Sequence, residues 1–292
     1  GDRASALARL KDNLMALPPQ VRNRISLEND ERVFTIEDAL NICGKCGLPA
    51  IFDVFHHSLN APAHGTQAYW LDRAVESWSP QHGRPKLHYS QQLADGKPGM
   101  HSRFIGMKDF VEFHGSLEGR DLDVMLEVKD KNLSAVKCIN LTNPKLTRHE
   151  LTREWARYKY LVLERDQAAY NAFRAMLKAD APDAREFYSL MEQTLAKEIY
   201  GPQARNAAEH VWGYVDKFAT AAEKKRALAA MTELHNGPAA LPRGPAVGGV
   251  AAGPRLGGPL LQRRAAARAS QPRGQRGACV VAVLVQQAQQ LD

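Results

Sequence analysis

The feature that most constrains the fold is an alternation of short apolar segments and longer amphipathic segments over residues 1–142. The short segments predict strands, and the apolar residues between them recur with helical spacing. Such units of roughly 30 residues are typical of right-handed βαβ connections and a parallel sheet. We therefore expect an α/β fold, with strands at residues 24–27, 50–54, 86–89 and 123–128.

Each predicted strand carries a possible metal ligand at its carboxyl end. These residues are Glu28, Asp53, His88 and Glu127, and His56 follows Asp53 by three positions. In a parallel α/β barrel the carboxyl ends of the strands meet at one rim, so we expect these side chains to converge. Carboxylates and imidazoles without cysteine suit hydrolytic divalent ions better than a structural zinc ion.

The acidic residues also have simpler interpretations. Glu28 and Glu127 can be solvated or ion-paired strand ends. Asp53 stands inside an apolar strand, where an unpaired charge is costly, so a compensating cation explains it better.

Histidines are concentrated in one stretch, since seven of the ten lie between residues 56 and 114. If the backbone there is extended, adjacent side chains point in opposite directions, so we choose His56 as a ligand and assign His57 to packing. His101, in an expected loop, is a further ligand candidate. We expect the other three to lie on the surface or on helices: His64, His82 and His114.

Two lysines accompany the expected ligands. Lys86 alternates with His88 on one face of its strand and so points toward the same site. There it can bind phosphate, form a chemically modified bridge between metal ions, or pair with an acid. Lys129 follows Glu127 by two residues and is either a phosphate contact or a solvated lysine.

The positive charge is concentrated at the carboxyl end of the chain. Residues 237–292 hold seven arginines and one acid among nine glycines, six prolines and twelve alanines, which predicts a disordered tail. The remaining 236 residues carry 32 bases and 31 acids within the total of +7. The net charge therefore identifies no partner for the folded part.

Cysteine and hydropathy patterns exclude other classes. Cys43 and Cys46 have redox or zinc spacing, but no second pair exists and a helix precedes the motif instead of following it, so we expect no function there. The longest apolar run has eight residues, 278–285, whereas a membrane span needs about 18–20. We expect no membrane partner and no secretion, and a cytoplasmic location at the nucleoid, or a nuclear one in a eukaryote.

Four sequence segments together resemble the UV damage endonuclease family (UvdE/UvsE). They are LENDER at residues 27–32, FDVFHHSLN at 52–60, RPKLH at 84–88 and DVMLEVK at 123–129. Their order, spacing and residue types match over about residues 1–142.

The resemblance implies a TIM-barrel endonuclease similar to endonuclease IV. Such enzymes nick damaged double-stranded DNA immediately 5′ to cyclobutane pyrimidine dimers and 6-4 photoproducts. A cluster of metal ions is implied, typically Mn²⁺, with Mg²⁺, Co²⁺ or Zn²⁺ as alternatives, and a carboxylated lysine at Lys86. We expect Lys86, Glu28 and Glu127 to act in catalysis and Lys129 to contact DNA. The implied metal ligands are Glu28, Asp53, His56, His88, His101 and Glu127.

The chain also departs from the family, whose eight-stranded barrel typically takes about 250 residues. We expect a partial barrel of about four strand–helix units, equivalent to the carboxyl-terminal half, at residues 1–144. A helical extension at 145–236, with its aromatic residues mostly in a core, and the disordered tail at 237–292 follow. We expect a monomeric fragment with an incomplete site that is inactive on its own.

Two other classes of function remain open. A TIM-barrel sugar isomerase or epimerase uses a similar metal set, and nicking of irradiated plasmid without ketose–aldose exchange would exclude it. A non-catalytic fragment would bind no divalent cation, and its DNA affinity would survive deletion of residues 1–142.

Overall fold

Four short parallel strands form one sheet in the computed structural model of the chain, which describes residues 2–180 and 182–236. The strands lie side by side in their order along the chain, which is the arrangement of consecutive strands in a TIM barrel. The expected α/β fold with four strand–helix units is confirmed. The strands are β1 (Leu27–Glu28), β2 (Ala50–Asp53), β3 (Lys86–Tyr89) and β4 (Asp123–Leu126).

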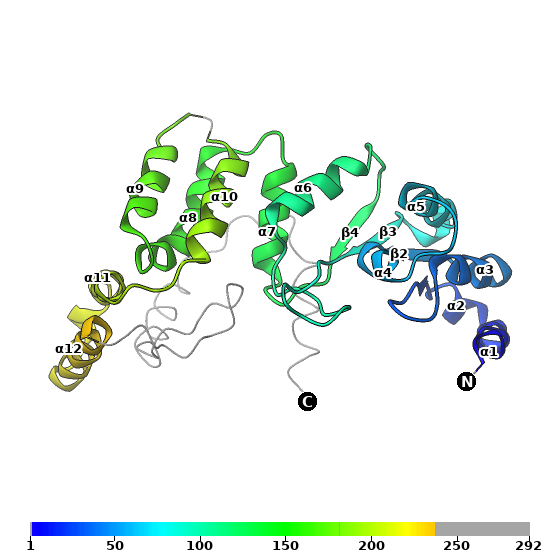
Figure 1. Ribbon diagram of the computed structural model, residues 1–292, viewed down its shortest axis with the longest axis horizontal. Coiled ribbons are helices and arrows are strands. Elements are labelled where there is room, and N and C mark those ends of the chain that lie inside the picture. Colours follow the sequence, from blue (N-terminus) through cyan, green and yellow to red (C-terminus); the bar gives the residue numbers. More distant parts are fainter. Residues whose placement is uncertain (1, 181, 237–292) are drawn as a thin grey trace.

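Helices alternate with these strands along the chain (Figure 1). Two helices precede β1, at least one α-helix separates each pair of successive strands, and further helices follow β4. α3 packs against β1 and β2, and α5 packs against β2. The helices are α1 (Arg3–Ala16), α2 (Pro19–Arg22), α3 (Ile36–Cys46), α4 (Val54–Leu59), α5 (Gln67–Glu76), the 3-10 turn η1 (Pro80–His82), α6 (Met107–Ser116) and α7 (Asn132–Thr142).

The two faces of the sheet differ in chemistry. Alternate strand residues such as Phe52 and Leu87 are buried in a core shared with the helices. The residues between them, such as Asp53 and His88, face the other way, because successive side chains of a strand alternate. The register pairs Asp53 with His88, so these two polar side chains are neighbours on one face.

Local sequence signals explain where several helices begin and end. Thr35 and Asp38 form a capping box at the start of α3, and Gly47 ends that helix with a left-handed φ of 68°. The Asp53 side chain caps α4. The expectation of an extended backbone at His56 and His57 is therefore wrong, because both residues lie in α4.

In the described residues between 148 and 236 every regular element is a helix, and these helices occupy the other end of the molecule from α1–α5 (Figure 1), as expected. Trp155 lies in the core of this region, stacked on Phe173, as predicted for the aromatic residues. Tyr214 is 47% exposed, so the core prediction is wrong there. The elements are α8 (Arg148–Leu163), α9 (Gln167–Met176), α10 (Ala184–Leu195), α11 (Gly201–Trp212), the 3-10 turn η2 (Asp216–Phe218) and α12 (Ala221–Asn236).

One carboxylate joins the sheet-containing part to the helical region. Glu192 of α10 accepts hydrogen bonds from the buried Lys137 ammonium at 2.7 Å and from the Met107 N–H at 2.9 Å. Next to it, Asn140 donates to the hydroxyl of the buried Tyr188 at 2.8 Å. α7 and α10 are thus linked by polar contacts that are largely shielded from water.

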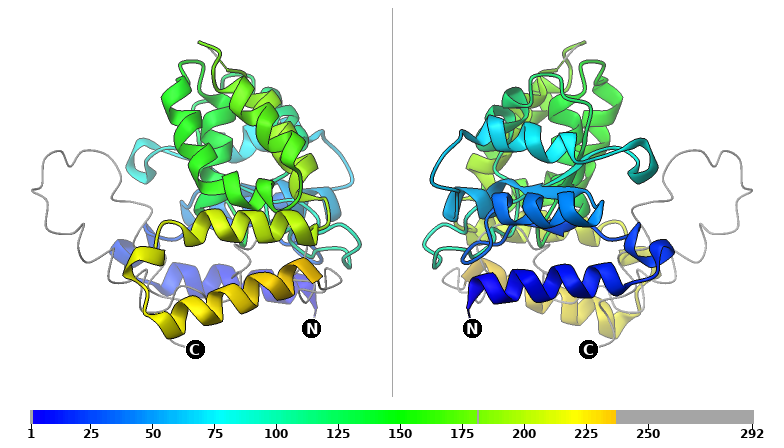
Figure 2. Two further views of the ribbon diagram at one scale, coloured as in Figure 1. Left: turned by 90° about the vertical axis from the view of Figure 1, so that its left-hand side faces the viewer. Right: turned by 90° about the vertical axis from the view of Figure 1, so that its right-hand side faces the viewer.

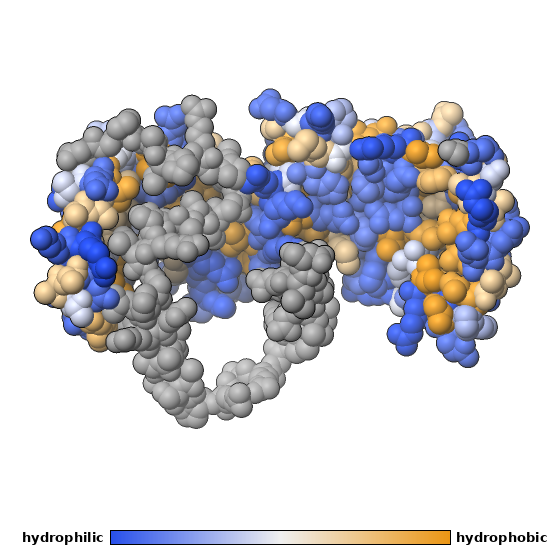
Figure 3. All heavy atoms as spheres, turned by 90° about the horizontal axis from the view of Figure 1, so that it is seen from below, coloured by the Kyte–Doolittle hydropathy of each residue, from blue (hydrophilic) through white to orange (hydrophobic). Residues whose placement is uncertain are grey.

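Hydropathy varies across the surface of the molecule. Seen from below, hydrophilic residues cover much of the middle of the molecule, and apolar residues gather toward α1 and α2 (Figure 3). Met15 and Val21 are among the exposed apolar side chains at that end. Among the described residues, no helix combines the length and hydropathy that a bilayer span requires. The expected disordered tail lies outside the described residues, and the domain boundaries and the monomeric state stay predictions.

Candidate metal centre

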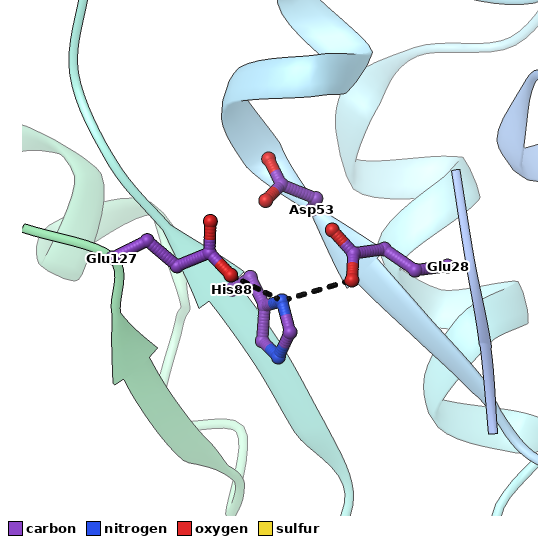
Figure 4. A group of neighbouring side chains, drawn as sticks. All are labelled: Glu28, Asp53, His88 and Glu127. Atoms are coloured by element: carbon purple, nitrogen blue, oxygen red, sulfur yellow. Dashed lines mark ion pairs between the residues drawn. The ribbon is translucent and has the colours of Figure 1, made fainter. Parts of the chain in front are cut away.

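The polar residues at the four strand ends converge at one edge of the sheet (Figure 4). Glu28, Asp53, His88 and Glu127 each offer one ligand atom, and these atoms all lie within 4.8 Å of one another. His88 Nδ1 is 3.1 Å from Glu28 Oε2 and 3.3 Å from Glu127 Oε1. The sequence placed these side chains at one rim, and the structure brings them together there.

The two other expected ligands border this cluster. His56 Nδ1 lies 3.3 Å from Glu28 Oε1 and 3.7 Å from Asp53 Oδ2. His101 Nδ1 lies 3.7 Å from Glu127 Oε2, and its ring centroid is 5.8 Å from that of His56. All six expected ligands are therefore within reach of one site, and their binding of metal stays a prediction.

Burial makes the cluster a good fit for a cation. Asp53 is 0% exposed and His88 is 8% exposed. Among the described residues, neither Asp53 Oδ2 nor His88 Nδ1 has a partner with hydrogen-bond geometry, and both atoms contact the cluster through ion pairs. A divalent ion among three carboxylates and an imidazole would give both buried atoms a direct bond.

The pKa values of the cluster reflect competition between burial and charge. Burial raises the pKa of Asp53 to about 6. Burial acts in the same direction on Glu28, but contacts with His56 and His88 outweigh it and lower the pKa to about 2. Contact with Glu28 raises the pKa of His56 to about 9. For His88, burial opposes charging, but Glu127 and Glu28 raise the pKa to about 10. Binding of a metal ion to an imidazole would displace such a proton.

Asn29 is a site residue that the sequence analysis missed. It is 1% exposed, its Nδ2 donates to the Asp53 carbonyl at 3.0 Å, and its Oδ1 accepts from the Asp53 N–H at 2.9 Å. Its own carbonyl lies 2.9 Å from His56 Nδ1, which fits an Nδ1–H donor and leaves Nε2 for other partners. Glu31 was also missed, and its Oε2 lies 4.0 Å from His56 Nε2. The available signal was a run of polar residues directly after the strand that ends in Glu28.

The expected lysines lie outside the converging group. Lys86 shares the face of β3 with His88, but its Nζ lies 3.8 Å from Asp123 Oδ2 and 5.3 Å from the centroid of the Trp78 ring. This contact corresponds to the ion-pair alternative considered for Lys86. Lys129 is exposed, so its contact with DNA stays a prediction.

The remaining histidines lie where the sequence analysis placed them. His57 is buried, with its ring centroid 4.9 Å from that of Phe52, as the packing assignment required. His64 and His114 are exposed and His82 is partly buried, and none of the three belongs to the cluster.

The Cys43–Cys46 pair has no features of a redox centre. Both cysteines are buried in α3, and the Cys43 thiol donates to the Pro49 carbonyl at 3.4 Å. Burial raises the pKa of Cys43 to about 12, which disfavours the reactive thiolate.

Comparisons with known proteins point to one family for the strand-containing part. The family model UV-endonuclease UvdE matches residues 1–156, and a model described as a protein of unknown function (DUF1722) matches residues 159–243. A UV DNA damage endonuclease from Clostridium perfringens is 33% identical over 211 residues, which are 69% of this chain and 49% of that protein. One from Bacillus pumilus is 30% identical over 141 residues, covering 48% of this chain and 44% of that protein.

A solved structure gives a similar extent of match. The crystal structure of SacUVDE matches with 35% sequence identity and a TM-score of 0.43, covering 47% of this chain and 45% of that one. The chain spans about half the length of the curated relatives it matches.

The UvdE match covers more than half of the 292 residues. It contains all four strands and every residue of the converging cluster. The chain thus belongs to the UV-endonuclease UvdE family.

Proposed function

We propose that this chain supplies part of a divalent-metal centre that cuts DNA immediately 5′ to UV photolesions, including pyrimidine dimers and 6-4 photoproducts. The observation that carries the proposal is the convergence of four strand-end ligands around buried atoms without hydrogen-bond partners. Membership of the UvdE family supports the assignment to DNA repair. No observation favours a sugar isomerase.

The donor set suits Mn²⁺, with Mg²⁺, Co²⁺ and Zn²⁺ as alternatives, because carboxylate oxygens are combined with imidazole nitrogens. Glu28, Asp53, His88 and Glu127 would hold the ions, with His56 and His101 completing the coordination. A bound divalent ion supplies an activated water and neutralises charge on the phosphate.

The exposure of each carboxylate indicates its proposed role. Asp53 is fully buried and is fixed by Asn29, so it serves as an anchor. The side chains of Glu28 and Glu127 are 30% and 35% exposed, so they face the open side, where they can accept a proton from an attacking water.

We assign Lys86 and Lys129 to contacts with DNA phosphates. Exposed Lys129, two residues beyond Glu127, contacts the DNA backbone. Lys86 reaches the site by exchanging its ion pair with Asp123, since it already shares the face of β3 with His88. The proposed partner is damaged double-stranded DNA, bound by a monomer at the nucleoid, or in the nucleus of a eukaryote.

The test is nicking of UV-irradiated supercoiled plasmid with Mn²⁺. Because the four converging ligands all lie in this chain, we propose weak nicking in place of the inactive fragment expected from the sequence. The chain spans about half the length of its relatives, so nicking should be slower than by the Clostridium perfringens relative assayed beside it. Nicking should depend on irradiation and should disappear in Asp53→Asn. The matched control is Asp12→Asn, whose carboxylate is on the surface of α1.

Mapping the cut on an end-labelled duplex with one defined dimer should place it on the 5′ side. Complete absence of Mn²⁺-dependent nicking, equal nicking by Asp53→Asn, or ketose–aldose exchange would overturn the proposal.

A further inference from the structure

We propose that a corner of the helical region, formed by α8, the turn between α11 and η2, and η2 itself, binds single-stranded DNA. The corner consists of Lys159, Tyr160, Tyr214, Lys217 and Phe218. It lies within the segment that matches the family of unknown function and outside the metal cluster. This inference extends beyond the proposed incision, because it assigns a separate binding surface to the helical region.

The first half of the corner is two tyrosines held beside one lysine. Tyr160 donates a hydrogen bond to the Tyr214 hydroxyl at 2.9 Å, although the residues are 54 positions apart in the chain. Lys159 Nζ lies 3.4 Å from that hydroxyl, and it is 4.7 Å from the Tyr160 ring centroid and 5.7 Å from that of Tyr214. The tertiary structure therefore fixes an exposed ring next to an ammonium group.

The second half repeats this combination four residues further along. Phe218 is 55% exposed, and Lys217 Nζ lies 5.2 Å from its ring centroid. The next helix, α12, carries three exposed basic residues in succession after its first three positions, Lys224, Lys225 and Arg226. Figure 2 shows α11 and α12 side by side at this end of the molecule.

Exposed rings interleaved with cations fit a single nucleic-acid strand best. A strand with unpaired bases can stack them on aromatic side chains, while lysines contact its phosphates. A duplex offers no free base faces, because its bases already stack on one another. The core of a protein–protein interface is depleted in lysine, so rings flanked by lysines match a protein partner less well.

The test measures binding of a fluorescein-labelled oligothymidylate to the full chain by anisotropy, in EDTA. We expect tighter binding of the oligothymidylate than of a duplex of equal length. Tyr214→Ala combined with Phe218→Ala should weaken binding about tenfold or more, because each stacked base contributes strongly. Tyr214→Phe keeps the ring and should change the affinity by less than about threefold.

Two further variants test whether lysine charge contributes to DNA binding and whether any exposed tyrosine would have the same effect. Lys217→Gln should reduce the dependence of the affinity on salt, because it removes one phosphate contact. The matched control is Tyr69→Ala on α5, since Tyr69 is 46% exposed and Tyr214 is 47% exposed. This control should leave the affinity unchanged.

Equal binding by the double variant and the wild type, an equal loss in Tyr69→Ala, or a preference for duplex would each overturn the proposal. The proposal would also be overturned if the double variant differed from the wild type in oligomeric state on sedimentation but bound DNA equally well. The corner would then be a contact between copies of the chain. Circular dichroism checks the fold of each variant, and Tyr214→Phe and Lys217→Gln keep the test decisive if the double variant unfolds. Because the assay uses no metal and no lesion, its result is independent of the incision assay.

Discussion

Replacing Asn29 by alanine should destabilise the fold and weaken metal binding together. The substitution leaves the N–H and the carbonyl of Asp53 without their partners in a place where Asn29 is 1% and Asp53 is 0% exposed. Each buried backbone group that loses its hydrogen bond costs about 1–3 kcal/mol. With two such groups, we expect the free energy of unfolding to fall by about 2–6 kcal/mol.

Urea unfolding in EDTA measures this loss without any contribution from metal. A titration of the folded variant with Mn²⁺ then compares its affinity for the ion with that of the wild type. We expect a lower affinity, because the Asp53 backbone has lost its hydrogen bonds to the Asn29 side chain. Asn29→Asp keeps an acceptor for the Asp53 N–H, but it places a second acceptor against the carbonyl and adds a charge beside Glu28. It should therefore cost at least as much stability as Asn29→Ala.

The control is Asn171→Ala, because Asn171 is exposed on α9. This control should change stability by no more than about 0.5 kcal/mol. A loss of less than about 1 kcal/mol in Asn29→Ala would mean that Asn29 does not hold the Asp53 backbone, since it would fall below the cost of leaving the two buried groups unpaired.

Three further predictions concern other parts of the structure. Glu192→Ala removes the acceptor of the buried Lys137 ammonium and of the Met107 N–H. Urea unfolding should therefore show that the free energy of unfolding falls by about 1–3 kcal/mol. An unchanged unfolding midpoint would contradict the linking role of Glu192. Burial raises the pKa of Cys43 to about 12, so this thiol should resist alkylation at pH 8 until the protein unfolds. Rapid labelling of the Cys43 peptide, detected by mass spectrometry, would show instead that the thiol is accessible. Phe173→Ala should lower the free energy of unfolding by about 3–5 kcal/mol, because Phe173 is 0% exposed in the helical core; a loss below about 2 kcal/mol would mean that the core closes over the cavity.

Much of the sheet could be predicted from the sequence because its signals are local. Strand residues such as Phe52 and Leu87 are apolar, and a polar candidate ligand lies at or next to the carboxyl end of each strand. Parallel connection rules then place those ends at one edge without any knowledge of distant contacts. Pairing determines the strand limits, so β1 covers only Leu27–Glu28, whereas residues 24–27 were expected.

The features that the sequence did not predict depend on contacts between distant residues. Asn29 acquires its role from the backbone of a residue 24 positions away. Lys86 was placed on the correct face of β3, but its pairing with Asp123 depends on the register between β3 and β4. For His56, the choice over His57 rested on an extended backbone, whereas the Asp53 side chain in fact caps a helix there. His56 still borders the cluster, because the first turn of α4 starts at Asp53.

Calorimetric titration with Mn²⁺ shows whether the strand-end carboxylates and imidazole hold a divalent ion. The wild-type chain should bind at least one Mn²⁺. Asp53→Asn and His88→Ala should each weaken that binding at least about tenfold, with Asp12→Asn as the unchanged control. If the wild type bound no Mn²⁺, or if Asp53→Asn bound it as tightly as the wild type, the cluster would not be a metal site.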